Sequence, residues 1–395
     1  MIPAMDAQLK TFIRKNIEKN TADLALQYAG KTDLPIVYAL DQIKARQQAK
    51  QKLPSWYLND DLIFPPGISI EQCSSERAAI FKSRKYSGTC SLDLTGGTGI
   101  DTLALSKRFK KGVYVEPSKE LCELFKHNAA ILNGNNIQIN EQSAEVFLKE
   151  NEDTYDLIYL DPSRRDEYDQ RVYRLDACLP NCIELLPLLL DRSDKILIKS
   201  SPMLDIKQAI ADLNYVRLVQ TVAIDNEMKE VLLHIERGCE GETQIEAWNL
   251  VKENEEQSFA FTHAHEKGVD ASYRTPQTFL YDVNVAIMKA GAFKSVAKQY
   301  NLKKLGVHTH LYTSENLIAD FPGRVFKIEE NVKPSKKQVL KSIPSKKVNV
   351  ITRNYPINTN EVKKKFSLHD GGDRYAFFCD VVEIGATCLL CSRIY

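Results

Sequence analysis

The sequence has no segment typical of a secretory signal or a membrane span. Residues 1–20 carry charges at Asp6, Lys10 and Arg14, whereas a secretory signal has a continuous apolar core. No apolar run approaches the length of a membrane helix, because the run at residues 185–190 is short and contains Pro187. We therefore expect a cytoplasmic protein.

The sequence also lacks an excess of charge of either sign. Its 53 Lys and Arg residues balance 52 Asp and Glu residues, and the formal net charge is +1. A net charge this small creates no overall field that would attract nucleic acids or membrane surfaces. The length of 395 residues predicts two or three domains, and a content of 43% hydrophobic and 27% charged residues is typical of soluble globular proteins.

The spacing of Cys and His residues does not match a metal site. Nine cysteines without a secretory signal are expected to be free thiols. Cys388 and Cys391 form a CxxC pair in an apolar run that predicts a strand, where residues three apart face opposite sides. Cys178 and Cys182 are expected on one face of a helix. The two histidine pairs are each expected on one face of a strand: His263 with His265, and His308 with His310. No third ligand is spaced to match them, so we expect no bound metal.

The most informative stretch is residues 91–101, SLDLTGGTGID. It predicts a buried strand, a glycine-rich turn and the start of a helix over residues 100–109. Gly96, Gly97 and Gly99 have no Cβ, so the backbone there can adopt positive φ and approach a ligand closely. This order of elements is typical of sites for nucleotide-type cofactors.

The turn departs from the dinucleotide fingerprint G-x-G-x-x-G, since Thr102 stands where the third glycine is needed. The order Asp93-x-x-x-Gly97-x-Gly99 instead resembles motif I of class I methyltransferases, which bind S-adenosylmethionine (SAM). A cofactor with cationic groups and no pyrophosphate also suits an acidic turn. SAM is the favoured ligand, with a dinucleotide and a purely structural turn as the alternatives.

Residues 89–236 alternate between strand and helix patterns. We predict strands over 89–94, 112–115, 137–140, 156–160, 195–198, 216–223 and 230–235. The helices expected between them cover 100–109, 118–132, 144–149, 175–189 and 206–213. The pattern predicts an α/β fold with a doubly wound, Rossmann-like parallel sheet and an antiparallel hairpin at its edge. Ligands of such sheets bind at the carboxyl ends of the strands.

Two of these strand ends carry further cofactor candidates. Glu116 follows the second strand, where its carboxylate could accept both hydrogen bonds of a ribose diol or act as an acid near the N-terminus of the next helix. After the third strand, Ser143 occupies the position of the Asp that meets adenine in the RNA methyltransferases that this stretch resembles, and Ala144 leaves room for the ring. The cofactor-binding residues that we expect are Asp93, Thr95, Gly96, Gly97, Gly99, Glu116, Ser143 and Ala144.

The fourth strand runs into Asp161-Pro162-Ser163-Arg164-Arg165. This resembles motif IV, the Asp/Asn-Pro-Pro signature of methyltransferases that act on amino or ring nitrogens. A carboxylate and a backbone carbonyl that accept the protons of a conjugated amine localise its lone pair, and proline fixes the turn. Asp161 and Pro162 are therefore the candidate catalytic residues.

The substrate side departs from that signature, because Ser163 and Arg164 replace a second proline and a stacking aromatic. Arg164 and Arg165 could hold a base or a phosphate, or form ion pairs with nearby acidic residues. Lys199, after the fifth strand, could face a substrate phosphate or carboxylate, or form a structural salt bridge. Ser163, Arg164, Arg165 and Lys199 are the candidate substrate-binding residues.

The flanking regions differ from this core. We predict a helical leader over residues 1–85, the SAM domain over 86–237, and a connector subdomain over 238–320 that includes a helix over 285–300. Residues 321–395 predict the order β-α-β-α-β-β and contain 14 Lys and Arg against 7 Asp and Glu. This lysine excess favours a nucleic-acid-holding module, with a solvated surface as the alternative.

Together, the two motifs and the C-terminal α/β module resemble bacterial class I methyltransferases with a THUMP-like domain. The resemblance implies a SAM-dependent methyltransferase that modifies RNA, with a nitrogen of a tRNA base as one target. Two alternatives remain: a methyltransferase that acts on a protein or a small molecule, and a non-catalytic protein that binds SAM or RNA.

Overall fold

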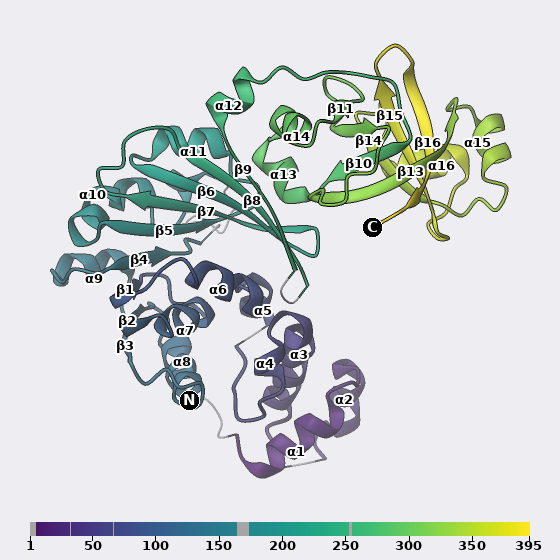
Figure 1. Cartoon of the computed structure of the whole chain (residues 1–395). Coiled ribbons are helices and arrows are strands. Elements are labelled where there is room, and N and C mark those ends of the chain that lie inside the picture. Colours follow the sequence, from purple (N-terminus) through teal and green to yellow (C-terminus); the bar gives the residue numbers. More distant parts are fainter. Residues whose placement is uncertain (1–4, 32, 66, 164–173, 253–254) are drawn as a thin grey trace. The chain divides into compact units, whose positions relative to one another are not determined.

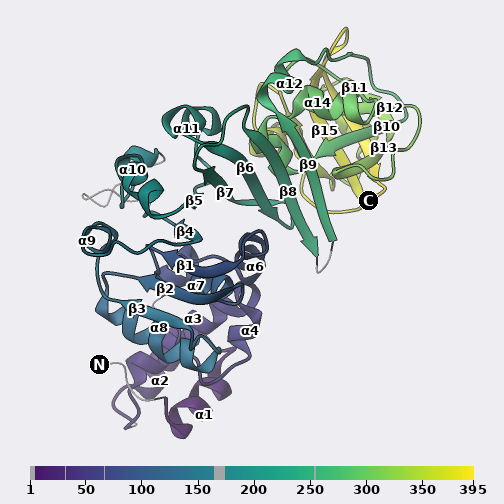
Figure 2. The same ribbon diagram turned by 60° about the vertical axis from the view of Figure 1, so that its left-hand side comes forward.

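The computed structural model describes residues 5–31, 33–65, 67–163, 174–252 and 255–395. The chain forms two compact units, shown in two orientations in Figures 1 and 2. The first unit is Met1–Arg217 with Val231–Glu240, and the second is Leu218–Glu230 with Gly241–Tyr395. Among the described residues, no helix has both the length and the apolar character that crossing a membrane requires.

The first unit begins with helices, as predicted for residues 1–85. These are α1 (Ala7–Asn16), α2 (Thr21–Tyr28), α3 (Ile36–Lys52), α4 (Pro54–Tyr57), α5 (Gly67–Gln72) and α6 (Glu76–Ser83). Helix α3 joins two cores: Ala39 and Ile43 pack with α1 and α2, whereas Ala45 and Ala49 pack in a cluster that contains Phe125. This cluster attaches the helical leader to the helices that follow the glycine turn.

The sheet of the first unit has the strand order β3-β2-β1-β4-β5-β7. Its strands are β1 (Gly88–Asp93), β2 (Phe109–Val115), β3 (Ile137–Asn140), β4 (Leu157–Leu160), β5 (Lys195–Ser200) and β7 (Glu227–Glu236), the last counted from Val231 in this unit. The helices between them are α7 (Ile100–Ser106), α8 (Lys119–Ile131), α9 (Ala144–Glu150), α10 (Cys182–Arg192) and α11 (Ile206–Asp212). The first five strands are parallel, and β7 is antiparallel to β5. The doubly wound α/β sheet is confirmed, with β1 and β4 side by side in its middle.

The helix predicted over 175–189 is wrong in its first half. A short 3-10 turn covers Leu175–Ala177, and α10 starts only at Cys182. The side chain of Asn181 accepts hydrogen bonds from the N–H groups of Ile183 and Glu184, so it caps the helix N-terminus. Cys178 and Cys182 therefore do not share a helix face.

The second unit contains two groups of strands. One consists of β6 (Val216–Ile224), β8 (Gln244–Lys252) and β9 (Glu255–Thr262), with β8 parallel to β6 and antiparallel to β9. The other is a seven-stranded sheet in the order β11-β12-β10-β13-β16-β15-β14. Its strands are β10 (Phe279–Val283), β11 (Lys303–Lys304), β12 (Leu311–Ser314), β13 (Gly323–Val332), β14 (Asn349–Arg353), β15 (Arg374–Val381) and β16 (Gly385–Arg393).

The C-terminal order β-α-β-α-β-β is confirmed, with α15 (Lys336–Ser342) and α16 (Thr359–Phe366) between the strands. The CxxC pair lies on β16 as predicted, with its two thiols on opposite faces. Cys388 packs in a cluster with helix residues Val339 and Val362, whereas Cys391 packs in another cluster with Phe326. All nine cysteines are free. In the described part of the chain, no group of His, Cys, Asp and Glu side chains could hold a metal.

The histidine pairs do not lie on strands, so their placement was predicted wrongly. His263 and His265 belong to α12 (His263–Gly268), because the Thr262 side chain accepts a hydrogen bond from the N–H of His265 and caps a helix. His308 and His310 lie in the loop before β12. The helix expected near residues 285–300 is two helices, α13 (Val285–Ala290) and α14 (Phe293–Gln299), separated at Gly291 with φ +83°.

Candidate active site

The carboxyl ends of the parallel strands in the first unit open on a cavity of about 1030 Å³. Residues at or after the ends of β1, β2, β3, β4 and β5 line it, together with residues 71–74 at the end of α5 and directly after it. The sequence-predicted residues among the lining are Asp93, Thr95, Gly96, Gly97, Glu116, Ser143, Ala144, Asp161, Pro162, Ser163 and Lys199. Gly99 lies just behind the lining, and Arg164 and Arg165 fall outside the described residues.

The glycine turn rests on two stacked aromatic rings. Tyr114 and Phe125 lie with their ring centroids 4.1 Å apart, and the Tyr114 hydroxyl donates a hydrogen bond of 2.7 Å to the Gly97 carbonyl. A Cβ on Gly96 would lie 2.2 Å from the Tyr114 ring, and one on Gly99 would lie 2.0 Å from Phe125. The rings leave no room for side chains at either glycine.

Gly97 differs from its neighbours because it faces open space. Its φ is +54°, and the nearest atom to a Cβ built there is the Thr95 carbonyl oxygen at 3.7 Å. The Gly97 N–H donates to the Glu116 carboxylate at 2.9 Å, and the Ser118 N–H donates to the other oxygen of Glu116 at 2.9 Å. Glu116 thus lines the cavity and also binds the N-terminus of α8. Because each carboxylate oxygen has two lone pairs, the residues present fit a cofactor that lies over Gly97 and reaches Glu116.

Ser143 and Ala144 lie where the chain enters α9. The Ser143 hydroxyl accepts a hydrogen bond of 3.3 Å from the Val146 N–H, so its first role is to cap this helix. Ala144 is buried and its small side chain lines the cavity. Both residues therefore lie at the position that the sequence predicted, beside the end of β3.

Asp93 is buried at the end of β1. Its carboxylate accepts hydrogen bonds from the Thr95 N–H at 3.0 Å and from the Thr102 hydroxyl at 2.5 Å. Burial raises the pKa of Asp93 to about 7, although these two hydrogen bonds lower it and the charges of Asp101 and Asp161 raise it further. The charge of Asp93 therefore changes near neutral pH.

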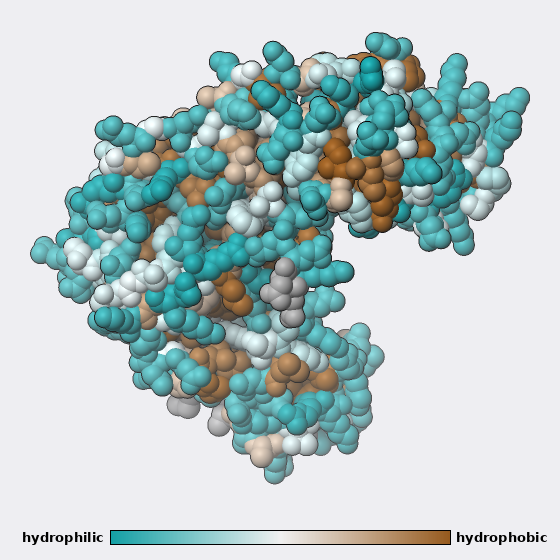
Figure 3. Space-filling model, in the orientation of Figure 1, coloured by the Kyte–Doolittle hydropathy of each residue, from teal (hydrophilic) through white to brown (hydrophobic). Residues whose placement is uncertain are grey.

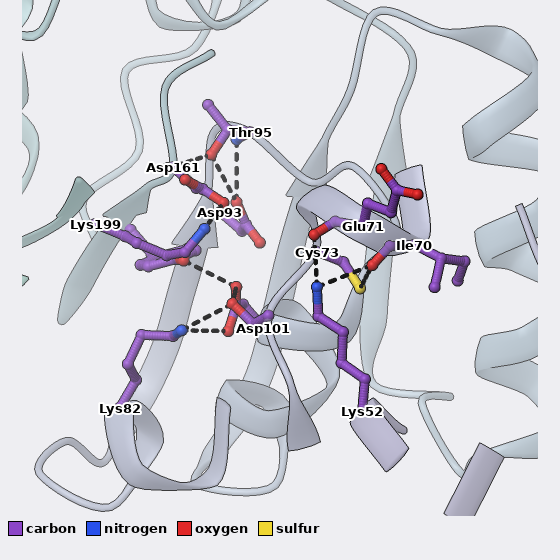
Figure 4. Close-up of polar contacts among 12 residues, drawn as sticks. Lys52, Ile70, Glu71, Cys73, Lys82, Asp93, Thr95, Asp101, Asp161 and Lys199 are labelled. Atoms are coloured by element: carbon purple, nitrogen blue, oxygen red, sulfur yellow. Dashed lines mark hydrogen bonds and ion pairs between the residues drawn. The ribbon is translucent and has the colours of Figure 1, made fainter. Parts of the chain in front are cut away.

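Asp161 is held from two sides (Figure 4). Its backbone N–H donates to the Thr95 hydroxyl at 2.6 Å, and its carboxylate forms an ion pair with the ammonium of Lys199. The motif after β4 is therefore bonded directly to the glycine turn after β1. Of the two alternatives for Lys199, the salt bridge is the one present.

A network that the sequence did not reveal lies beside this pair (Figure 4). Asp101 accepts hydrogen bonds from the hydroxyls of Ser74 at 2.7 Å and Tyr159 at 2.9 Å, and lies 3.1 Å from the ammonium of Lys82. Burial raises the pKa of Asp101, but the charges of Lys82 and Lys199 and the hydrogen bonds from Ser74 and Lys82 outweigh it, so its pKa is below the usual value. Asp101 remains ionised and attaches α6 to the edge of the cavity.

Comparisons with known proteins show which families and structures the chain is similar to. Residues 73–221 match the family described as conserved hypothetical protein 95, residues 279–322 match a ferredoxin-like domain, and residues 323–393 match a THUMP-like domain. The chain is 30% identical to a protein of Porphyromonas gingivalis W83 whose crystal structure is described as a presumed methyltransferase; the match covers 98% of both chains, with a TM-score of 0.87.

Two other solved structures are similar to parts of the chain only. A SAM-dependent methyltransferase from Agrobacterium tumefaciens is 15% identical over 41% of this chain and 60% of its own, with a TM-score of 0.31. A presumed methyltransferase from Escherichia coli is 18% identical over 38% of this chain and 77% of its own, with a TM-score of 0.28. No curated protein matches the chain.

Proposed function

The chain belongs to the same family as the Porphyromonas gingivalis protein and is a SAM-dependent methyltransferase, and we propose that it methylates a nitrogen of an RNA base, with tRNA as the first candidate substrate. The resemblance to class I methyltransferases with a THUMP-like domain, on which this proposal rests, is confirmed by the matches over both regions. We also propose that the protein acts in the cytoplasm, because tRNA is available there. The balanced numbers of acidic and basic residues are compatible with this location.

We assign the cofactor to the half of the cavity that contains the glycine turn. The open space over Gly97 would accommodate the methionine part, Glu116 would accept hydrogen bonds from the ribose, and Ser143 and Ala144 would border the adenine. Thr95, Gly96 and Gly99 shape the turn, and Asp93 fixes it through Thr95 and Thr102. When bound, SAM supplies a methyl group on a cationic sulfur.

One observation carries the proposed chemistry: the hydrogen bond from the Asp161 N–H to the Thr95 hydroxyl. It fixes Asp161 against the cofactor turn, so an amine bound by Asp161 would lie next to the methyl group. The Asp161 carboxylate and the carbonyl of Asp161 or Pro162 would accept the protons of this amine, which leaves its lone pair free to attack. Lys199 would orient the carboxylate, and transfer then depends mainly on in-line positioning.

The proposal of RNA rests on the C-terminal module. Helices α15 and α16 pack on the same face of their sheet and contact each other. Their outward residues and the loop between α15 and β14 form a lysine surface: Lys336, Lys337, Lys341, Lys346, Lys347, Lys364 and Lys365, all exposed. The area over these two helices is predominantly hydrophilic in Figure 3. Such a concentration of ammonium groups suits phosphate contacts on RNA.

The function is tested by incubating the protein with radiolabelled SAM and bulk tRNA from cells that lack the enzyme, and then mapping the labelled nucleoside. We expect label in a single nucleoside. If SAM binds in calorimetry but no RNA is labelled, the acceptor is a protein or a small molecule. If SAM does not bind, the assignment of the glycine turn itself is wrong.

The lysine surface gives a separate prediction. Replacing Lys337, Lys364 and Lys365 together with glutamine should weaken RNA binding at least about tenfold at moderate salt and flatten the salt dependence, because each lost phosphate contact removes roughly one unit of the slope of log K against log salt. SAM affinity should not change. The matched control replaces Lys107, Lys110 and Lys111, which are exposed in the first unit. Equal losses in both variants would contradict a dedicated RNA surface.

Asp93 gives a pH-dependent prediction. Its pKa is raised to about 7, so the free protein holds a proton there at lower pH, whereas a cationic cofactor favours the ionised carboxylate. SAM affinity should therefore rise about tenfold from pH 5.5 to 7, a range in which an α-amino group remains protonated. Calorimetry in buffers of different ionisation enthalpy should detect proton release. Asp93→Asn should bind weakly without this pH dependence, and an unchanged pH profile in that variant would exclude Asp93 as the titrating group.

A further inference from the structure

Two apolar side chains are exposed in the part of the cavity that contains Asp161 and Lys199, which we call the acceptor side. Leu179 is 49% exposed and Met203 is 66% exposed, although both line the cavity. A single exposed apolar residue is ordinary on a protein surface. Among the large apolar residues exposed in the described part of the chain, these are the two that also line the cavity. Because both side chains line the same cavity, we expect them to contact a bound ligand.

Leu179 is fixed beside the motif that follows β4. The Ser163 N–H donates to the Leu179 carbonyl at 2.6 Å, and the Leu179 N–H donates to the Ser163 carbonyl at 3.3 Å. This antiparallel bridge holds Leu179 opposite Ser163, two residues after Asp161. Pro180, the next residue, also lines the cavity and limits movement of the backbone.

Met203 is connected to Asp161 through a second segment, the loop that follows β5. It lies four residues after Lys199, whose ammonium binds the Asp161 carboxylate. The Met203 N–H donates to the Ser201 hydroxyl at 3.1 Å, which closes a turn, and Pro202 in that turn lines the cavity. Leu179 and Met203 are thus held on two loops that are each tied, through Ser163 and Lys199, to the same acceptor motif.

We propose that Leu179 and Met203 form an apolar clamp that holds the planar ring of the acceptor base beside Asp161. This inference rests on the proposed function and names the residues that select a ring-bearing acceptor. Ser163 offers no ring for stacking, so another surface must contact the faces of the base. A thioether makes favourable contacts with aromatic rings, and leucine supplies apolar surface that a ring can cover. Base faces are alike in all four nucleosides, so the clamp would select a ring while Asp161 selects its amine.

The clamp is tested first by kinetics on RNA. Leu179→Ala and Met203→Ala should each raise KM for RNA about tenfold, while kcat changes little and SAM affinity by calorimetry stays within twofold. Leu179→Met and Met203→Leu should retain KM because they keep the apolar contact. The controls are Leu26→Ala and Ile80→Ala, at residues that are 80% and 63% exposed in the same unit but not in the cavity lining. An unchanged KM in the alanine variants, or an equal rise in the controls, would overturn the clamp.

A second measurement separates this inference from the proposed function. Saturation-transfer NMR with S-adenosylhomocysteine and each of the four ribonucleosides should show ring-proton contacts with the wild-type protein that the Leu179→Ala, Met203→Ala double variant loses. If RNA is methylated but no nucleoside shows this dependence, the clamp is wrong and the function stands. If RNA is not methylated but the dependence is present, the function is wrong and the clamp stands.

Discussion

Asp161→Ala is expected to lower the rate of methyl transfer about 10³-fold, within the range usual for a lost proton acceptor, while SAM affinity stays within about twofold. The carboxylate lies 31% exposed in the cavity and is oriented by Lys199, so its loss removes the acceptor for the protons of the attacking amine. The backbone N–H that binds Thr95 remains in the variant, and the glycine turn keeps its contact. Single-turnover labelling and calorimetry measure the two quantities separately.

The control for this prediction is Asp161→Asn. Its amide oxygen can still accept one hydrogen bond but carries no charge, so we expect a loss between those of wild type and Asp161→Ala. Retained turnover in Asp161→Ala would contradict the catalytic role. A parallel loss of SAM affinity would instead assign Asp161 to the cofactor half of the cavity.

The sequence predicted those parts of the site that lie close together along the chain. The strand, turn and helix around Gly97 were found because glycine spacing and apolar periodicity are local signals. Asp161 was predicted as a site residue because the residues next to it carry the motif, and it lines the cavity. The parallel strand order then brings these segments together at one edge of the sheet, as the fold class requires.

The contacts between distant segments could not be predicted. Lys82 and Asp101 lie on different helices, and nothing in either helix marks the other as its partner. Tyr114 was expected only as a residue of a strand, but its ring lies directly against Gly96 in the glycine turn. The choice between a substrate contact and a salt bridge for Lys199 also depended on Asp161, which follows another strand, β4.

Local patterns failed where a polar side chain ends or starts a helix. The apolar spacing over 175–189 suggested one helix, but Asn181 caps a new helix start after Pro180. The alternating histidines at 263 and 265 looked like a strand, but Thr262 and Glu266 fix a helix there. Glu266 accepts hydrogen bonds from the N–H groups of Phe293, Lys294 and Ser295, so this helix is held by a segment far along the chain.

The Lys199 salt bridge also changes how the acceptor side should be understood. The Asp161 carboxylate already neutralises the charge of the Lys199 ammonium, so in our proposal most phosphate contacts come from elsewhere. The lysine surface of the second unit supplies candidates for them, and the cavity itself then needs to recognise only the base. Our proposals thus assign the phosphate contacts to the C-terminal module and the contacts with the base to Asp161, Leu179 and Met203.

Gly99→Ala is expected to destabilise the first unit by about 2–5 kcal/mol and to weaken SAM binding at least about tenfold. Two costs add at this position. The φ of +78° is unfavourable for alanine by roughly 1–2 kcal/mol. The new Cβ would also lie 2.0 Å from the ring of Phe125, which is fully buried and stacked on Tyr114, so overpacking adds roughly 1–3 kcal/mol. Thermal unfolding and calorimetry measure the two effects.

The matched control is Gly30→Ala, because Gly30 has a similar φ of +65° but no atom within 4 Å of its Cβ position. The free energy of unfolding of this variant should fall only by the backbone term of roughly 1–2 kcal/mol, and the variant should bind SAM normally. The difference between the two variants isolates the contact with Phe125. Phe125→Leu should make the Gly99→Ala substitution less costly, since residues in contact are not additive. If Gly99→Ala and Gly30→Ala prove equally stable, the Tyr114 and Phe125 rings move to accommodate the new methyl group without a loss of stability. Glycine at position 99 would then be required only for its backbone conformation.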